Sequence, residues 1–418
     1  MNVLSLLQFV LPWMVTFLLA AVVLRGVVRA WRPACPVAQK TISTKATLTA
    51  GLLLGAVCAA GAAFFVFYGR RACPGASLEE VLRHVFPTSI DADHYIQLAR
   101  YGYANLPDEQ AAFHDQHLMI VFFPLWPLLI RVGTWLTGLD GYVVGLLLQP
   151  LLLGLAGAGL YRLIAPHFGE KIVAWTLVLL ACMPGSFFFS APMTESLYLA
   201  LSVWALVCLE EDHPLGFAVL GLLTALTRST GGLLGGVALV AAVLCWRQGK
   251  SWLRWLAAAV GPFGGTGLYL CMNYYYYGDW TAFSKIQASH WSQGLGWIGD
   301  TVRYMLFYVA SWWESNHNFA LYVSLFGVIC IIGACLVLFC NRKQLPVCWL
   351  AYGVAYVLMA YGTTWLLSAP RYALSLPMLP LGAALVCKKD WQRALLAVVM
   401  GIVGIFYLQE FLAWGPIY

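Results

Sequence analysis

The sequence repeats apolar segments of roughly 17 to 25 residues along nearly its whole length. An α-helix rises about 1.5 Å per residue, so such a segment crosses the hydrocarbon core of a bilayer, which is about 30 Å thick. Lipid offers backbone N–H and C=O groups no partner, and helices are therefore the expected element. Hydrophobic residues make up 61% of the chain and charged residues 10%, against about a quarter charged in a soluble domain. The pattern predicts an all-α, polytopic integral membrane protein and excludes a soluble domain.

The first apolar segment, residues 3 to 24, has no basic residues before it and no small-residue cleavage site. We therefore expect a retained helix rather than a secretory signal. Its arginines follow it, beginning at Arg25, and the positive-inside rule places the basic linker that ends at Lys45 in the cytoplasm and the N-terminus outside. A second span over residues 46 to 68 returns the chain to the outer side, where residues 69 to 117 form a long polar loop.

The next apolar segment, residues 118 to 136, contains Pro124, Pro127 and Arg131 and ends at the turn sequence TGLDG. If it crossed the membrane, Arg162 and the basic loops after it would fall outside. If it lies along the outer leaflet as an amphipathic helix, those loops stay in the cytoplasm. We choose the second arrangement, which gives about twelve spans, an interfacial helix on the outer face and both termini outside.

No internal repeat or second soluble domain appears, so residues 1–418 are predicted to form a single integral membrane domain. Within it, residues 1–25 form an additional N-terminal helix, and residues 69–136 form the outer catalytic loop with the interfacial helix. The later spans are expected at residues 141–161, 172–189, 194–209, 214–227, 231–246, 252–273, 318–340, 345–366, 371–387 and 391–412.

The net charge of +6 is explained by the cytoplasmic loops, and no nucleic-acid partner is expected. The motif GxxxxGK[ST] is absent, so the sequence offers no loop of that kind to cradle a nucleotide. Most of the twelve cysteines lie inside apolar segments, and only Cys73 falls clearly in an outer loop. Neither a disulfide framework nor a CxxC metal site is supported.

The polar residues outside the basic loops gather on the outer side, where Asp91 and Asp93 directly precede His94 and Tyr95. Ionisable groups at membrane depth are costly, so each tends to have a partner or a function. A carboxylate here suits a general base that takes a proton from a hydroxyl. Helix capping explains the same residues structurally, with Ser89 or Asp91 as the N-cap. The two roles can coexist.

His114 and His117 flank Asp115 at a spacing that brings both histidines to one face of a helix. Together with Asp91 or Asp93 they would form a set of ligands for a divalent metal ion. A solvated loop is the simpler interpretation of this spacing. The need for a divalent cation stays open.

Glu195 lies in the first turn of a predicted helix within FFFSAPMTESLYL, where capping is the simple interpretation. Three outer-face cations, Arg228, Lys285 and Arg371, are each explained as snorkelling anchors. Converging on one cavity, they would suit a phosphate or pyrophosphate, because arginine provides bidentate donors. The segment FFPLWP at 122–127 places aromatic rings at headgroup depth, as ordinary anchors do.

Six motifs occur in order: DADHYIQLARYGY, FFPLWPLLIR, FFFSAPMTESLYL, LTRSTG, YGDWTAFSKIQ and SAPRYALSLP. Together they resemble the motifs of the PIG-V family, the GPI mannosyltransferase 2 type and its bacterial relatives, which are GT-C glycosyltransferases. The resemblance covers residues 85 to 385, which is most of the chain. Ile90 stands where the family commonly has Trp, and Trp126 stands where Tyr is usual.

The resemblance implies a GT-C-like membrane enzyme that takes a sugar, usually mannose, from a polyprenyl-phosphate donor. The sugar passes with inversion to a lipid or glycan acceptor on the non-cytosolic face. The family's catalytic carboxylate falls on Asp91, with Asp93 as the alternative, and Arg371 would meet the departing phosphate with help from Lys285 or Arg228. The other residues expected to bind substrate are His94, Tyr95, His114, His117, Phe123, Trp126, Glu195 and Tyr372.

Two other classes of protein fit part of the sequence. A transporter or lipid flippase predicts ionisable residues near the middle of the membrane and broken helices in two related halves. A metal-dependent hydrolase would be built on the histidines and aspartates of the outer loop and would lose activity with a chelator. The ordered motifs favour the transferase, surrounded by membrane lipids in a bacterial cytoplasmic membrane, with its site on the periplasmic face.

Overall fold

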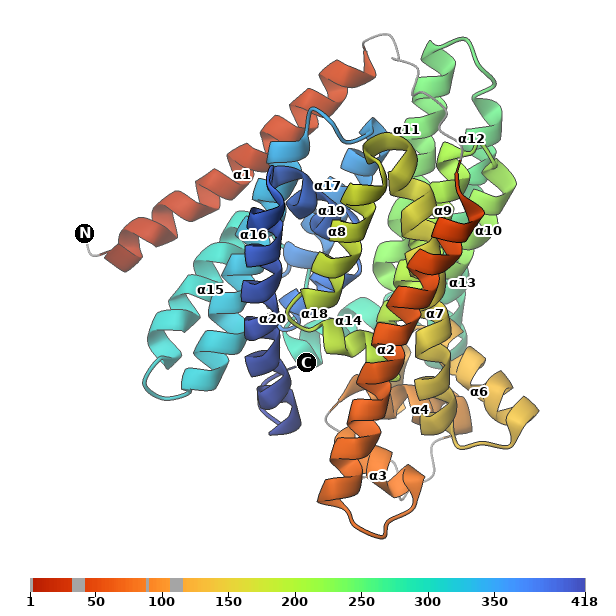
Figure 1. Cartoon of the computed structure of the whole chain (residues 1–418), viewed down its shortest axis with the longest axis vertical. Coiled ribbons are helices and arrows are strands. Elements are labelled where there is room, and N and C mark those ends of the chain that lie inside the picture. Colours follow the sequence, from red (N-terminus) through yellow and green to blue (C-terminus); the bar gives the residue numbers. More distant parts are fainter. Residues whose placement is uncertain (1–2, 32–41, 88–89, 106–115, 418) are drawn as a thin grey trace.

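The computed structural model describes residues 3–31, 42–87, 90–105 and 116–417 (Figure 1). Over these residues the chain is helical, and its extended pairing is limited to one isolated bridge between Leu295 and Thr363. Seven helices in this part of the chain are long and apolar enough to cross a membrane, which confirms the predicted all-α, polytopic membrane architecture. They are α1 (Val3–Ala30), α2 (Thr44–Ala72), α7 (Gly141–Phe168), η3 with α11 (Ser229–Gly232 and Leu233–Arg247), α12 with α13 (Leu253–Ala258 and Val260–Tyr277), η4 with α16 (Phe319–Leu325 and Phe326–Asn341) and α20 (Asp390–Leu412).

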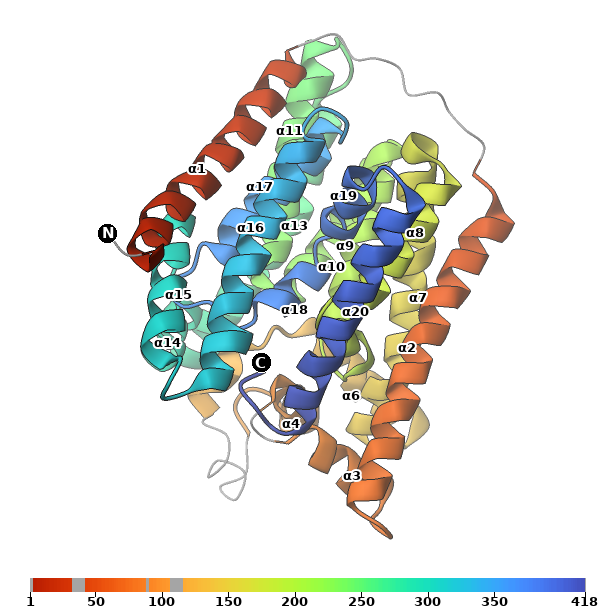
Figure 2. The same ribbon diagram turned by 60° about the vertical axis from the view of Figure 1, so that its left-hand side comes forward.

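Five shorter helices of the described chain occupy the positions of the other predicted spans. At about 1.5 Å per residue, the 13 residues of α8 extend about 20 Å, less than the about 30 Å of hydrocarbon. The connecting element α18 (Ala369–Leu374) lies near mid-height of the bundle in both views (Figures 1 and 2). These helices therefore turn back inside the bundle instead of at its surface. They are α8 (Glu170–Cys182), α9 (Glu195–Glu210), α10 (Pro214–Ala225), α17 (Val347–Tyr361) and α19 (Met378–Val386), and η2 (Ser186–Ser190) joins α8 to α9.

The elements between α2 and α7 gather at one end of the bundle (Figure 1). Among them, α6 is the predicted interfacial helix: its Trp126 and Ile130 are buried, whereas Trp135 is 81% exposed. One face of α6 therefore packs on protein while the other is free to meet lipid. In the described part of this stretch the elements are α3 (Leu78–Val85), α4 (Asp91–Tyr101), η1 (Gln116–Val121) and α6 (Leu125–Thr137).

The basic loops lie toward the opposite end of the bundle. The connections from α7 to α8, from α11 to α12, from α16 to α17 and from α19 to α20 all come together there (Figure 1). Three of these connections carry Lys250, Lys343 and Lys388, and Lys171 lies in the first turn of α8. This separation of basic loops from the α3–α6 end matches the charge asymmetry used to orient the chain.

Helices α2 and α7 pack with their backbones in contact. A Cβ atom on Gly51 would lie 2.8 Å from the carbonyl oxygen of Gly154, so only glycine permits this approach. Small residues serve close helix packing in membranes in this way. Helix α7 begins after Asp140, whose Oδ1 accepts a hydrogen bond from Tyr142 N at 2.8 Å. The tight pair thereby fixes Tyr142 at the end of the bundle where α3, α4 and α6 lie.

The additional N-terminal helix α1 stands at the edge of the bundle, against α15 (Ile298–Trp312), α16 and α17 (Figure 2). An apolar cavity of about 390 Å³ lies between α1 and α17, and its lining includes Leu19, Trp297 and Leu358. The described lining of this cavity holds no charged side chain. Helix α1 therefore takes no part in the charged site described next.

Candidate active site

Three connections inside the bundle each carry one charged residue. Glu195 opens α9 shortly after η2, Arg228 directly precedes η3, and Arg371 lies in α18. Pro370 occupies the first turn of α18, where a missing backbone N–H leaves no intrahelical bond unmade. Because the flanking helices are short, these three residues reach a common depth within the bundle.

Arg371 is the centre of a cluster of four charged side chains. Its Nη1 donates to Asp91 Oδ2 at 2.6 Å, and its Nε donates to Glu195 Oε1. Arg228 Nη2 donates to the same Glu195 oxygen at 3.1 Å, and Arg228 Nη1 donates to Ser375 Oγ at 2.8 Å. Two guanidinium groups and two carboxylates thus meet, although Asp91 and Arg371 are 280 residues apart in the sequence.

The cluster opens to solvent on the Asp91 side. The Asp91 side chain is 36% exposed, whereas those of Arg371 and Glu195 are 5% and 0% exposed. Loss of hydration in the surrounding protein raises the pKa of the Asp91 carboxyl. The positive charge of Arg371 and its hydrogen bond lower that pKa by more. The pKa of Asp91 therefore lies below its ordinary value. Asp91 is an ionised, accessible carboxylate at neutral pH.

Glu195 has one carboxylate oxygen that the two arginines leave free. Its Oε1 accepts from both guanidinium groups, while Oε2 is buried without a hydrogen-bond partner in the described part of the chain. A buried and unpaired acceptor is costly. Glu195 therefore aligns both arginines and presents an acceptor to a further group. The predicted capping role is not observed, since α9 has no side-chain cap bond.

The two aspartates at the start of α4 have different surroundings. Asp93 is 1% exposed, and its Oδ1 accepts from Tyr142 OH and, at 3.2 Å, from Gln97 Nε2. Asp93 therefore joins α4 to α7, while Asp91 faces the arginines. Of the two capping candidates, Asp91 is the first helical residue of α4 and not its cap, because Ile90 occupies the cap position without a side-chain bond. The other candidate, Ser89, lies outside the described residues.

His94 and Tyr95, which were expected to bind substrate, pack against the aromatic segment that follows the outer loop. The His94 ring stacks on Phe122 with centroids 4.7 Å apart, and Tyr95 meets the same ring edge-on at 5.2 Å. Phe123 stacks on Tyr269 of α13 at 3.9 Å. These contacts hold α4 against the segment that leads into α6.

Trp126 is not the exposed interfacial anchor that its aromatic segment predicts. It is 0% exposed, and its Nε1 donates to the carbonyl oxygen of Pro192 at 3.0 Å. From the other side, Gln149 of α7 donates through Nε2 to the Met193 carbonyl oxygen at 2.8 Å. The two side chains therefore brace the connection that carries Glu195.

Lys285 does not join the cluster. It lies on α14 (Ala282–Trp291), its Nζ is 2.5 Å from Asp279 Oδ2, and its side chain is 71% exposed. Convergence of Lys285 with Arg228 and Arg371 was predicted, but the turn at Asp279 holds the lysine at the surface. Pairing with Lys285 lowers the pKa of the Asp279 carboxyl to about 2.

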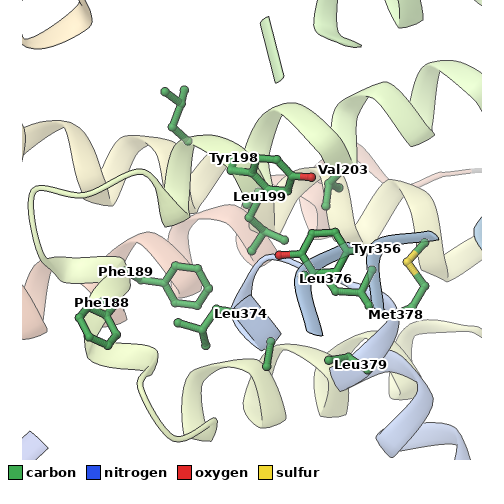
Figure 3. Close-up of a cluster of buried hydrophobic side chains, with 14 of the residues drawn as sticks. Phe188, Phe189, Tyr198, Leu199, Val203, Tyr356, Leu374, Leu376, Met378 and Leu379 are labelled. Carbon is green, nitrogen blue, oxygen red and sulfur yellow. The ribbon is translucent and has the colours of Figure 1, made fainter. Parts of the chain in front are cut away.

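A packed apolar layer supports the cluster. Figure 3 shows Leu374 of α18 facing Phe189 of η2. Tyr356 of α17 donates through its hydroxyl to the Tyr372 carbonyl oxygen at 3.0 Å. The Tyr372 ring centroid is 5.8 Å from the guanidinium carbon of Arg228. This packing fixes α18 and with it the direction of Arg371.

The predicted histidine site lies mostly beyond what the structure describes. His114 and Asp115 fall outside the described residues, and His117 lies in η1 but its side chain is outside them as well. Among the residues that are described, no group of three or more His, Cys, Asp or Glu side chains is placed to hold a metal ion. The metal site stays a prediction.

Sequence reasoning missed three side chains that shape the site: Tyr142, Gln149 and Ser375. Gln149 carried a usable signal, because a lone amide inside an apolar span needs a buried partner. Tyr142 and Ser375 carried none, since their partners lie 49 and 147 residues away.

No protein-family model matches the chain, and no curated protein matches it either. Among solved structures, the chain is similar to the archaeal oligosaccharyltransferase AglB from Archaeoglobus fulgidus in complex with an inhibitory peptide and a dolichol-phosphate. The identity is 10% and the TM-score 0.38, and the alignment covers 96% of this chain and 56% of that one. A similarity at this level carries no argument about function, which rests on the geometry described above.

Proposed function

We propose that the protein is a GT-C-type glycosyltransferase that moves a sugar, preferably mannose, from a polyprenyl-phosphate donor to an acceptor hydroxyl. The observation that carries the proposal is the pairing of the partly exposed Asp91 with the buried Arg371 inside a helical membrane bundle. A base and a phosphate-binding cation then stand side by side at a depth that a lipid-linked substrate reaches laterally. The resemblance of the ordered motifs to the PIG-V family supports the same activity.

The donor phosphate is assigned to Arg371 and Arg228. Both guanidinium groups are anchored on Glu195 Oε1, which leaves the Nη1 groups bonded to Asp91 and Ser375. Arginine binds phosphate with parallel donors, so these Nη1 groups are the ones a phosphate takes over. A phosphate that replaces Asp91 on Arg371 also frees the carboxylate to meet the acceptor.

At the anomeric carbon of the donor sugar, the transfer forms one bond and breaks one. The acceptor oxygen attacks the anomeric carbon of the donor sugar, and the bond from that carbon to the phosphate oxygen breaks. The proton of the acceptor hydroxyl passes to Asp91. The electron pair of the broken bond stays on the lipid phosphate, whose charge Arg371 meets. Inversion, which the resemblance to the PIG-V family implies, requires the acceptor oxygen and the departing phosphate to lie on opposite faces of the anomeric carbon.

Glu195 Oε2 supplies a fixed acceptor close to the arginines. In the proposed complex Glu195 Oε2 accepts a hydrogen bond from a hydroxyl of the donor sugar. That bond gives a partner to an oxygen that has none in the described part of the chain. The proposed setting is a bacterial cytoplasmic membrane with the site on the periplasmic side, since the basic loops lie toward the opposite end of the bundle.

The test is transfer of labelled mannose from polyprenyl-phosphate-mannose to membrane-lipid and glycan acceptors by the purified full-length protein. Asp91→Asn and Asp93→Asn form a matched pair, two residues apart on one helix. Asp91→Asn is expected to lower transfer by about 10²–10⁴-fold, the contribution of a general base. Asp93→Asn is expected to retain transfer in proportion to the folded protein. Equal transfer by wild type and Asp91→Asn would remove Asp91 as the base, and no transfer by wild type from any polyprenyl-phosphate sugar would remove the function.

A lipid-phosphate transporter is the second candidate, and the recessed arginines on short helices favour it. A transporter moves its lipid across the bilayer without consuming it. In vesicles, labelled polyprenyl-phosphate-mannose that changes leaflet while its sugar stays attached would support transport. Sugar release that depends on an acceptor would support transfer.

A further inference from the structure

A second cavity lies beside the charged cluster, and the proposed chemistry does not yet use it. Its volume is about 250 Å³. It is lined by Ile90 ahead of α4, by Asn316 and Phe319 around the start of η4, by Phe411 near the end of α20, and by residues 414–417. The walls thus come from three parts of the chain that meet only in the folded protein.

The cavity lies beside the residue that precedes Asp91, and two aromatic rings connect it to Arg371. Ile90 immediately precedes Asp91. On another wall, the Phe411 ring meets Phe188 with centroids 5.5 Å apart, and the guanidinium of Arg371 lies 5.5 Å from the centroid of the same Phe188 ring. A ligand in this cavity therefore contacts the residue next to the proposed base, and the rings of Phe411 and Phe188 separate it from the proposed phosphate-binding arginine.

The segment that closes the cavity is held in a defined conformation. Gly415 N donates to the Glu410 carbonyl oxygen at 2.9 Å, and Glu410 Oε1 accepts from Asn318 Nδ2 at 2.6 Å. Trp414 has a φ of 58°, a left-handed conformation that strains a residue with a large side chain, and its ring packs on His84 at 5.3 Å. Strained residues persist where surrounding contacts hold them, often at ligand sites.

The lining has the chemistry that recognises a sugar ring. Phe319, Phe411 and Trp414 offer flat apolar faces to the C–H groups of a pyranose. Asn316 offers an amide for its hydroxyls, oriented because its Oδ1 accepts from Phe319 N at 3.3 Å. The volume is below the range of about 300–1,000 Å³ that encloses drug-sized ligands, so it suits a single ring rather than a lipid chain.

We propose that this cavity binds a hexopyranose ring of the acceptor and presents its hydroxyl to Asp91. The assignment rests on the proposed glycosyl transfer and makes the acceptor a glycan or glycolipid. The donor sugar shares this chemistry, but it is tied to the phosphate on Arg371. The acceptor has to enter on the side of the base, where Ile90 forms the wall.

The first test separates the two substrates kinetically. Trp414→Ala and Asn316→Ala are compared with Trp391→Ala, a control at the other end of α20 whose tryptophan is 61% exposed and away from the cavity. The KM for the acceptor is expected to rise about tenfold in the cavity variants while the donor KM stays within about twofold, because only acceptor binding loses contacts. Trp414→Phe keeps a ring and is expected to recover most of the affinity. A rise in the donor KM alone, or no change in either KM, overturns the assignment.

The second test needs no turnover. Binding of methyl α-D-mannopyranoside and methyl α-D-glucopyranoside to the Asp91→Asn protein is measured by saturation-transfer NMR, with and without Trp414→Ala. Loss of the glycoside signal only with Trp414→Ala supports the sugar site, and equal signals overturn it. The melting temperature of each variant shows that the protein is folded. Wild-type protein that binds glycoside through Trp414 but transfers nothing would refute the transferase and leave the sugar site standing.

Discussion

Among the described residues, an ion pair near the basic loops is partly exposed, whereas the ion pair of Arg371 and Glu195 is buried. At the end with the basic loops, Arg162 and Glu211 are 2.5 Å apart, with side chains 35% and 29% exposed. At the site, the paired side chains of Arg371 and Glu195 are 5% and 0% exposed. The same two chemical groups therefore meet in partial contact with solvent near the basic loops and enclosed by protein in the cluster.

Removing one partner is expected to cost little stability in the partly exposed ion pair and much more in the buried one. Exposed pairs contribute about 0–1 kcal/mol, because water screens the charges and ordering long side chains costs entropy. Buried pairs seldom stabilise more than apolar packing would, yet removing one partner leaves a charge without compensation. The buried cluster is therefore better explained by binding and catalysis than by stability.

The largest expected effect is the loss of the carboxylate that both arginines share. Glu195→Ala leaves two buried guanidinium groups with Asp91 as their remaining partner in the cluster, and is expected to destabilise the protein by about 3–5 kcal/mol. Unfolding followed in detergent micelles measures the change. Arg228→Ala in the same background should restore part of the loss, because it removes one uncompensated charge. If Glu195→Ala changed the free energy of unfolding by no more than loss of a surface ion pair does, about 0–1 kcal/mol, the cluster would have to be hydrated.

A smaller loss is expected at the buried aspartate that faces away from the arginines. Asp93→Ala leaves the buried Tyr142 hydroxyl and Gln97 amide short of an acceptor, which is expected to cost about 1–3 kcal/mol. Tyr142→Phe is the matched variant, and the double variant should cost less than the sum because the lost bond is shared. Strict additivity would contradict a direct contact between the two side chains.

The third expectation concerns pH. The pKa of Asp91 is lowered in the folded protein, so its stabilising contribution is present above the ordinary Asp pKa of about 3.9. That contribution is lost as the pH falls through the lowered value. The difference in Tm between wild type and Asp91→Asn should therefore be constant from pH 7 to about 5 and shrink in more acidic solution. A difference that grows on acidification would mean that the pKa is raised instead.

The smallest effect belongs to the exposed end. Glu211→Ala breaks the pair with Arg162 and is expected to change the free energy of unfolding by about 0–1 kcal/mol, less still in high salt. The same unfolding assay used for Glu195→Ala checks it. A loss comparable to that of Glu195→Ala would erase the contrast between the two ends.

Local patterns predicted the fold better than the site. Helices such as α2 and α7 follow from hydropathy and length, which neighbouring residues determine, and the order of basic loops gave their direction. Asp91 and Arg371 were both chosen from their motifs, but that they touch depends on a contact across 280 residues. Asp91 stays partly exposed because of how α4 packs, and the sequence alone does not reveal that packing.

Two separations among the predicted site residues have specific physical reasons. Asp91 and Asp93 are two residues apart, and on a helix such residues do not share a face. The two carboxylates therefore have different partners, and which of them faces the arginines depends on Tyr142 from α7. Lys285 was grouped with the arginines by charge, while the Asp279 carboxylate six residues before it held it at the surface.

The shortness of α8 has a consequence for the membrane itself. Its 13 residues reach about 20 Å, and Val178 on its surface is 42% exposed. Where lipid contacts α8, the helix is shorter than the hydrocarbon core of an ordinary bilayer. Either the bilayer thins locally, or water occupies the space beyond the end of the helix. The proposed transferase would then work best in membranes of short-chain lipids, and bilayer thickness would tune its turnover.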